Sequence, residues 1–103
     1  MKASDYIVQF LADQGIEKAF GYIGGAVAHL YDSFDKNDSI EIVNTIHEQG
    51  AGFAAEGYAR VSGKTGVATA TSGPGATNLI TPIGSCFFDS IPTLFITGQV
   101  NTY

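Results

Sequence analysis

The chain has 103 residues, of which 45% are hydrophobic and 15% are charged, and its formal net charge is −5. This length allows one small domain, and the negative charge argues against nucleic acid or an anionic membrane as a partner. The charged fraction is below the level of about 25% that is typical of soluble domains, which indicates that further chain or another subunit covers part of the surface.

The N-terminus and the cysteine content bear on the cellular compartment. Residues 1–5 carry no hydrophobic signal core, and no apolar run reaches the length of a membrane span. The single cysteine, Cys86, excludes an intrachain disulfide and a thiolate metal cluster, and its apolar neighbours predict a small buried side chain. These features predict a cytoplasmic protein.

Apolar periodicity and turn residues predict alternating helices and strands. Ser4 or Asp5 can cap a first helix that ends at Gly15. Residues 18–22 are short and apolar enough for a buried strand, and a second helix is expected over 26–34.

The middle of the chain predicts a strand, a long helix and another strand. β-branched residues mark 40–46 as the second strand. A helix begins at Glu48 and stops near Gly63, and residues 66–71 form the third strand. A glycine-rich turn follows over 72–78.

The last predicted elements are a helix over 79–88 and a strand over 92–98. Pro82 is awkward inside this helix and predicts a kink or a late start. The strand is apolar throughout, as a fully buried parallel strand should be.

Strands that alternate with helices at this spacing predict an α/β fold, a parallel sheet with helices on both faces. By analogy with flavodoxin-like sheets, we expect the strand order 2-1-3-4. In such sheets ligands bind beyond the carboxyl ends of the strands. Gly24, Gly25, Glu48, residues 72–78 and Gln99 all fall at such ends.

Glu48 is the carboxylate that the sequence marks for chemistry. On a helical wheel it shares an apolar face with Ala51, Gly52, Ala55 and Tyr58. A carboxylate on such a face is neutralised, paired or held for chemistry, although a glutamate in a first helical turn can also simply cap backbone N–H groups. Glu56 and Arg60, four residues apart, are expected to form an ordinary surface pair.

Two phosphate-binding motifs are only half present. Residues 63–65 imitate the end of a P-loop, but Tyr58 stands where the first glycine belongs, and the tripeptide closes a helix instead of opening one. Residues 73–75 with Asn78 half-match the dinucleotide fingerprint, but they follow the third strand instead of the first. A nucleotide-binding domain is therefore a minor hypothesis.

Histidine and serine chemistry is weakly supported. His29 projects from a helix and is expected at the surface, whereas His47 lies at a strand end and could reach a substrate. Ser72, Ser85 and Ser90 lack a histidine and acid arrangement, which argues against a nucleophilic serine. No cluster of carboxylates and histidines predicts a metal site.

These stretches together resemble the N-terminal, pyrimidine-binding domain of thiamine-diphosphate-dependent enzymes, in particular the acetolactate-synthase-like members. The resemblance covers essentially the whole chain. It rests on four stretches in order: FGYIGGAV (20–27), HEQGAGFAAEGYAR (47–60), TSGPGATNL (71–79) and DSIPTLFITGQV (89–100). Any one of them alone would be weak evidence, but four at the family spacing are strong.

The resemblance implies roles for individual residues. Glu48 would hydrogen-bond the pyrimidine ring nitrogen of thiamine diphosphate and so activate the cofactor for attack on a 2-oxo acid. Tyr22, Gly24 and Gly25 would approach the pyrimidine, and Ser72, Pro74 and Asn78 would line the cofactor pocket and a subunit contact. His47 and Gln99 are the candidates for substrate contact. The family builds its site between two chains, so a homodimer or homotetramer is expected, and some relatives also bind a flavin such as FAD.

Two departures from the family pattern leave a relative with another donor or acceptor as an alternative to acetolactate synthase itself. Ile23 and Asn101 stand where these synthases usually carry proline. The family's diphosphate and magnesium site lies in another domain, so residues 1–103 are expected to form an incomplete pyrimidine-binding domain that is inactive alone. A non-catalytic assembly or regulatory module of the same fold is the alternative hypothesis.

Overall fold

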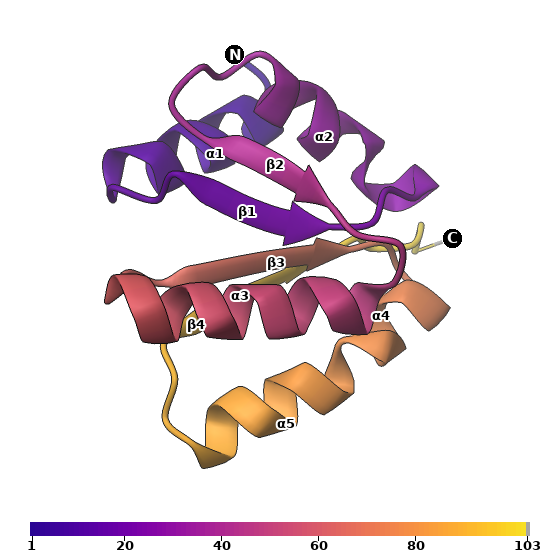
Figure 1. The fold of residues 1–103 in the computed structure, drawn as a ribbon. Coiled ribbons are helices and arrows are strands. Elements are labelled where there is room, and N and C mark those ends of the chain that lie inside the picture. Colours follow the sequence, from indigo (N-terminus) through magenta and orange to yellow (C-terminus); the bar gives the residue numbers. More distant parts are fainter. Residues whose placement is uncertain (103) are drawn as a thin grey trace.

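The computed structural model describes residues 1–102. Its elements are α1 (Ala3–Asp13), β1 (Lys18–Gly21), η1 (Gly25–Val27), α2 (Ala28–Asp35), β2 (Glu41–Asn44), α3 (Glu48–Ser62), β3 (Gly66–Ala70), α4 (Pro74–Asn78), α5 (Ile80–Phe88) and β4 (Thr93–Thr97) (Figure 1). Helices and strands alternate along the chain, as the sequence predicts.

The four strands form one parallel sheet in the order β2-β1-β3-β4. This order confirms the predicted α/β fold with its flavodoxin-like arrangement. Phe20 of β1 lies opposite Val43 of β2 on one side and Ala68 of β3 on the other. Because all four strands run in the same direction, their carboxyl ends lie along one edge of the sheet (Figure 1).

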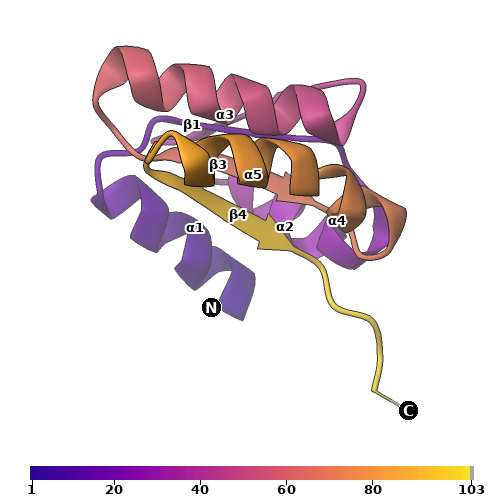
Figure 2. The ribbon, with the colours of Figure 1, turned by 90° about the horizontal axis from the view of Figure 1, so that it is seen from below.

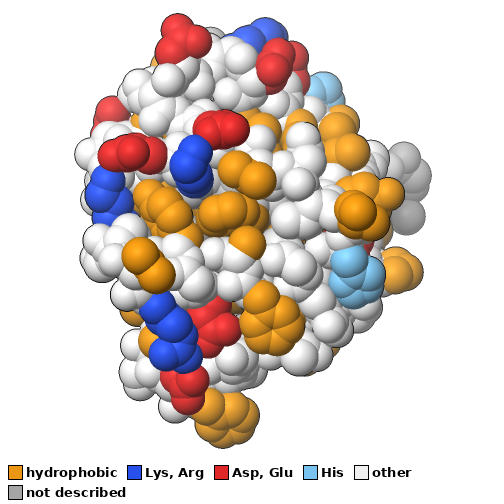
Figure 3. All heavy atoms as spheres, in the orientation of Figure 1, with side chains coloured by type: hydrophobic (Ala, Val, Ile, Leu, Met, Phe, Trp, Pro, Cys, Tyr) orange, Lys and Arg blue, Asp and Glu red, His pale blue; other side chains and the backbone are white. Residues whose placement is uncertain are grey.

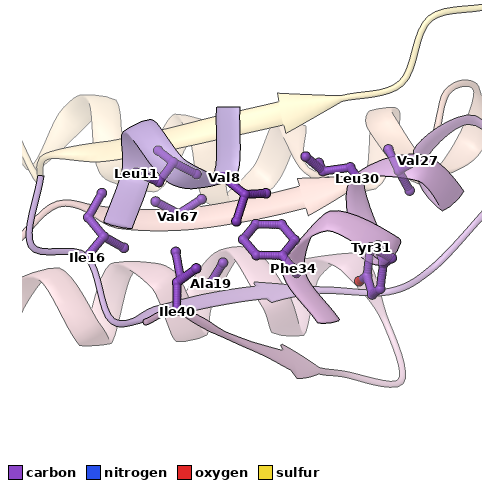
Figure 4. Close-up of a cluster of buried hydrophobic side chains, with 10 residues drawn as sticks. All are labelled: Val8, Leu11, Ile16, Ala19, Val27, Leu30, Tyr31, Phe34, Ile40 and Val67. Atoms are coloured by element: carbon purple, nitrogen blue, oxygen red, sulfur yellow. The ribbon is translucent and has the colours of Figure 1, made fainter. Parts of the chain in front are cut away.

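Helices cover both faces of the sheet. α1 and α2 lie on one face, and α3 and α5 lie on the other (Figure 1, Figure 2). The core under α1 and α2, drawn in Figure 4, consists of Val8, Leu11, Ile16, Ala19, Val27, Leu30, Tyr31, Phe34, Ile40 and Val67. The core under α3 and α5 consists of Ala55, Ala68, Ala70 and Leu79.

The small residues of α3 let this helix approach the sheet closely. A Cβ added at Gly66, the first residue of β3, would overlap the backbone carbonyl oxygen of Ala55. Ala51, Ala55 and Ala59 are all buried on the same side of the helix. The helix that begins with Glu48 is thus held directly against the central strands.

β4 is less buried than its apolar sequence predicts. Leu94 is 41% exposed, and Thr97 is exposed as well. The prediction of a fully buried strand is wrong because β4 lies at the edge of the sheet, where it pairs with β3 on one side and with no described strand on the other. β3, at the centre, is buried along its whole length.

The ends of two helices differ from expectation. α1 begins at Ala3 with Lys2 as its N-cap, and Asp5 contributes by accepting a hydrogen bond from the backbone N–H of Lys2 at 3.0 Å. The expected turn over 72–78 is instead helical from Pro74 onward, as α4, and a break at Leu79 separates it from α5, which begins at Ile80. Pro82 lies in the first turn of α5, where a missing N–H costs no intrahelical hydrogen bond.

The surface combines scattered charges with exposed apolar side chains. Cys86 is buried, which confirms its predicted environment. Ile46, Val61 and Phe88 are among the most exposed large hydrophobic residues, and Figure 3 shows apolar side chains across the face that carries α3. None of the helices within residues 1–102 is long and apolar enough to cross a membrane.

Candidate functional site at the carboxyl edge of the sheet

The segments that follow the strands start side by side. The backbone N–H of Thr45 donates to the carbonyl oxygen of Gly21 at 2.8 Å, and that of Gly98 donates to Ala70 at 3.0 Å. These bonds extend the strand pairing past the ends of β2 and β4. The predicted site residues at the strand ends therefore share one edge of the sheet.

Glu48, the first residue of α3, is the buried carboxylate of this edge, with 8% of its surface exposed. Its Oε2 accepts a hydrogen bond from Nδ2 of Asn78, the last residue of α4, at 3.1 Å. Among the side-chain hydrogen bonds within residues 1–102, Glu48 takes part in one, and its Oε1 does not take part in it. One oxygen is thus held in place, and the other remains available to a ligand.

Glycine at position 75 keeps the space beside Oε1 of Glu48 open. A Cβ at Gly75 would lie 3.5 Å from Oε1 of Glu48 and 2.7 Å from Cγ2 of Thr71. The arrangement therefore requires a residue without a side chain at this point of α4.

Thr71, which follows β3, connects the two glycine-containing segments of the site. Its Oγ1 accepts a hydrogen bond from the backbone N–H of Ala26 at 3.2 Å, and a Cβ at Gly24 would lie 2.5 Å from its Cβ. Sequence reasoning missed this residue. The sequence shows the glycines at positions 24 and 75, but only the folded chain shows that both pack against this threonine.

The other predicted cofactor residues lie on the same edge with different degrees of exposure. Gly24 packs against Thr71, whereas a Cβ at Gly25 would meet nothing within 4 Å. Tyr22 and Pro74 are exposed, and Ser72 is half-buried. The structure thus brings all of these residues to the segments that follow β1 and β3.

His47, a predicted substrate residue, caps α3. Its Nδ1 accepts a hydrogen bond from the backbone N–H of Gln49 at 3.1 Å, and its side chain is exposed. A cap of this kind stabilises the start of the helix that carries Glu48. Gln99, the other predicted substrate residue, is also exposed beyond β4.

Glu56 is buried, and its assignment to an ordinary surface pair is wrong. It does pair with Arg60, at 3.1 Å, but its Oε1 also accepts a hydrogen bond from Oγ of Ser85 at 3.0 Å. Only 7% of Glu56 is exposed, because α5 covers it. The hydrogen bonds that Arg60 donates to Glu56 and Asp89 raise the pKa of its guanidinium above the usual value.

All five basic side chains of the chain already bind carboxylates. The pairs are Lys2–Asp32, Lys18–Glu41, Lys36–Asp32, Arg60–Glu56, Arg60–Asp89 and Lys64–Glu17. The two lysines that bind Asp32 lower the pKa of its carboxyl to about 2. None of the five stands directly after a strand. The site can therefore donate and accept hydrogen bonds, but its own residues supply no cation for a polyanionic ligand.

Known proteins match this chain over most or all of the chain's 103 residues. The family described as "Thiamine pyrophosphate enzyme, N-terminal TPP binding domain" matches residues 1–103. Three curated relatives are 50% identical to it. They are the mitochondrial acetolactate synthase catalytic subunit of Saccharomyces cerevisiae, the chloroplastic acetolactate synthase of Arabidopsis thaliana and the acetolactate synthase isozyme 2 large subunit of Escherichia coli.

The alignments cover most of this chain and a small part of each relative. They span 91%, 96% and 98% of the chain, in the same order. The chain in turn spans 14%, 15% and 18% of the length of these relatives. With a family match over every residue, the chain belongs to the N-terminal TPP-binding domains of the thiamine pyrophosphate enzymes.

Proposed function

We propose that these residues form the pyrimidine-binding part of a thiamine-diphosphate-dependent enzyme that decarboxylates a 2-oxo acid and joins the product to an acceptor, as an acetolactate synthase does. The observation that carries the proposal is the state of Glu48. Its carboxyl group is buried, one oxygen is held by Asn78, and the other has no partner within residues 1–102.

The chain's own residues would bind and orient one end of the cofactor. Oε1 of Glu48 would share a proton with the pyrimidine ring nitrogen, while Asn78 keeps the carboxyl group in a fixed orientation. Burial excludes water that would compete for this hydrogen bond. When bound, thiamine diphosphate supplies a carbon nucleophile and an acceptor for the electron pair that decarboxylation releases.

The site fits the pyrimidine end of the cofactor better than its diphosphate end. Glu48, Asn78, Gly75 and Gly24 offer a buried carboxyl, an amide and close backbone approach. The basic side chains are all paired, and the described residues contain no group of three or more potential metal ligands. We therefore propose that another domain or a second subunit supplies the magnesium and diphosphate ligands, in a dimer or tetramer.

The test is Glu48→Gln in the natural protein that carries these residues. Gln keeps the shape and the hydrogen bond with Asn78, but its amide cannot exchange a proton with the ring nitrogen. We expect a loss of turnover of about 100-fold or more, the usual size of a general acid–base contribution, with thiamine diphosphate still bound in calorimetry. Substrate screening with 2-oxo acids, with and without FAD, would identify the donor and any flavin requirement.

Glu41→Gln is the matched control, because Glu41 is an exposed carboxylate whose ion pair among the described residues is with Lys18. It is expected to retain full turnover. A natural protein that binds no thiamine diphosphate, or in which Glu48→Gln behaves like the control, would instead be the non-catalytic assembly or regulatory module.

A further inference from the structure

One side of α3 contacts α4 and α5 at every helical turn. Four α3 residues, each four positions after the last, contact partners that also follow one another along the chain. The pairs are Glu48–Asn78, Gly52–Pro82, Glu56–Ser85 and Arg60–Asp89. α3 and α5 run in the same direction (Figure 2). We call this row of four contacts the seam.

Glu56 is the hydrogen-bonding centre at the far end of the seam. Its Oε1 accepts from Oγ of Ser85 at 3.0 Å and from Nη2 of Arg60 at 3.1 Å, and its side chain is 10% exposed. Arg60 continues to Oδ2 of Asp89 at 2.6 Å. The carboxylate is therefore bonded both to its own helix and to the neighbouring helix.

A charge at this position is not needed for stability alone. Taking a carboxylate out of water is costly, and an apolar pair of similar volume is often as stable as a buried ion pair. Apart from the two glutamates, Glu48 and Glu56, the buried residues of α3 are alanines and a glycine. A function in choosing one arrangement of the two helices explains the charge better than a function in strengthening the fold.

The seam permits only one register between α3 and α5. A shift of one helical turn, about 5.4 Å, would bring Glu48 or Glu56 against the ring of Pro82. Glu48 would then lose its hydrogen bond from Asn78, or Glu56 its hydrogen bond from Ser85, while the carboxylate remains buried, which is unfavourable. Gly52 is the residue that fits against Pro82, since a Cβ there would overlap the ring.

We propose that Glu56 is a positioning residue: by bonding Ser85 and Arg60, it sets the register that brings Asn78 within hydrogen-bond distance of Glu48. The proposal deepens the proposed function, since it assumes that the Glu48 carboxyl serves the cofactor. Two helical turns separate Glu56 from Glu48, so Glu56 itself does not reach the ligand.

The first test is structural and needs no cofactor. Crystal structures of the natural protein with Glu56→Ala, and with the double substitution Glu56→Leu/Ser85→Ala, would report the distance from Oε2 of Glu48 to Nδ2 of Asn78. We expect this contact, 3.1 Å in the native chain, to lengthen beyond hydrogen-bond distance or to become disordered. The apolar double variant is expected to unfold at nearly the native temperature, because Leu and Ala refill the space.

The second test measures the affinity for thiamine diphosphate in the natural protein. Both variants are expected to raise its Kd by about 3- to 30-fold, the range of coupling between distant residues. In an Asn78→Ala background the same changes should add little, because the contact that Glu56 orients is already absent. Glu17→Gln, which removes a carboxylate from an exposed pair with Lys64, is expected to leave the Kd unchanged.

A native Glu48–Asn78 distance and a native Kd in a stably folded Glu56→Leu/Ser85→Ala variant would overturn the proposal. Additive effects of the Glu56 and Asn78 substitutions would overturn it as well, because residues that act independently give additive free energies. Should the native protein bind no thiamine diphosphate, the proposed function fails, while the distance in the variant crystals still decides whether Glu56 positions Asn78.

Discussion

Gly52 of α3 lies against the ring of Pro82 of α5 with no room for a side chain between them. A Cβ at Gly52 would overlap Cγ of the ring and lie 2.5 Å from its Cβ. Gly52→Ala must therefore push α3 and α5 apart. We expect it to lower the free energy of unfolding by about 1–3 kcal/mol, the usual cost of overpacking, as measured by urea denaturation.

Gly57→Ala is the control for this substitution. Gly57 lies in the same helix, but a Cβ there would meet nothing within 4 Å. Alanine should therefore raise the free energy of unfolding by about 0.5–1 kcal/mol through its better helix propensity. Equal effects of the two substitutions would mean that the contact with Pro82 is not tight.

Tyr31→Phe should make the free energy of unfolding less dependent on pH in the alkaline range. The Tyr31 hydroxyl is buried without a hydrogen-bond partner among the described residues, and burial raises its pKa to about 12. The folded state thus disfavours ionisation, so this contribution to stability is complete below pH 10, the unfolded pKa of tyrosine, and is lost as the pH rises toward and through about 12.

Phenylalanine cannot ionise, so the variant should lose less stability than the native chain across that pH window. Near pH 7 it should be at least as stable, since it no longer buries an unpaired hydroxyl. Unfolding in urea at several pH values measures both effects. Tyr6→Phe, at an exposed position, is the control, and a steeper alkaline decline for Tyr31→Phe than for the native chain would contradict the explanation.

His47 allows its function as a helix cap to be separated from the predicted contact with substrate. His47→Ala removes the acceptor for the backbone N–H of Gln49 and should cost about 0.5–2 kcal/mol of stability, whereas His47→Asn keeps a capping side chain. If His47 also contacts the 2-oxo acid, both variants should raise its KM in the natural protein. A normal KM for the stably folded His47→Asn would limit this residue to capping.

Much of the fold follows from local sequence patterns. The glycine-punctuated alternation of strands and helices predicts the parallel sheet, and the placement of Glu48 and residues 72–78 at strand ends predicts their common edge. These inferences succeed because each depends on residues close together in the chain. The sequence does not predict the exposure of β4, because an apolar strand has the same residue pattern at the edge of a sheet as at its centre.

The errors at the site concern contacts between distant segments. Glu56 looks like a surface residue because Arg60 follows four positions later. In the folded chain Ser85, 29 residues away, also donates a hydrogen bond to its carboxylate. Thr71 is unremarkable by itself, and only the folded chain shows that Gly24 and Gly75 both pack against it. Partners at such separations leave no periodic signal in the sequence.

Gly75→Ala should disturb the ligand side of Glu48 in two separable ways. The new methyl group would lie 2.7 Å from Cγ2 of Thr71, a clash that must shift α4, and 3.5 Å from Oε1 of Glu48, an ordinary contact that occupies the open side of the carboxylate. We therefore expect both a loss of stability of about 1–3 kcal/mol and weaker binding of thiamine diphosphate, measured by calorimetry.

Adding Thr71→Ser to Gly75→Ala separates these effects. Serine lacks Cγ2 but keeps the hydroxyl that accepts the hydrogen bond from the backbone N–H of Ala26, so the double variant should recover most of the lost stability. Its methyl group still lies beside Oε1 of Glu48, so cofactor affinity should stay low. Gly84→Ala, where a Cβ meets nothing within 4 Å, should leave affinity unchanged. Recovery of affinity together with stability would mean that Gly75 serves only the packing of α4 and that the open oxygen of Glu48 is not where the cofactor binds.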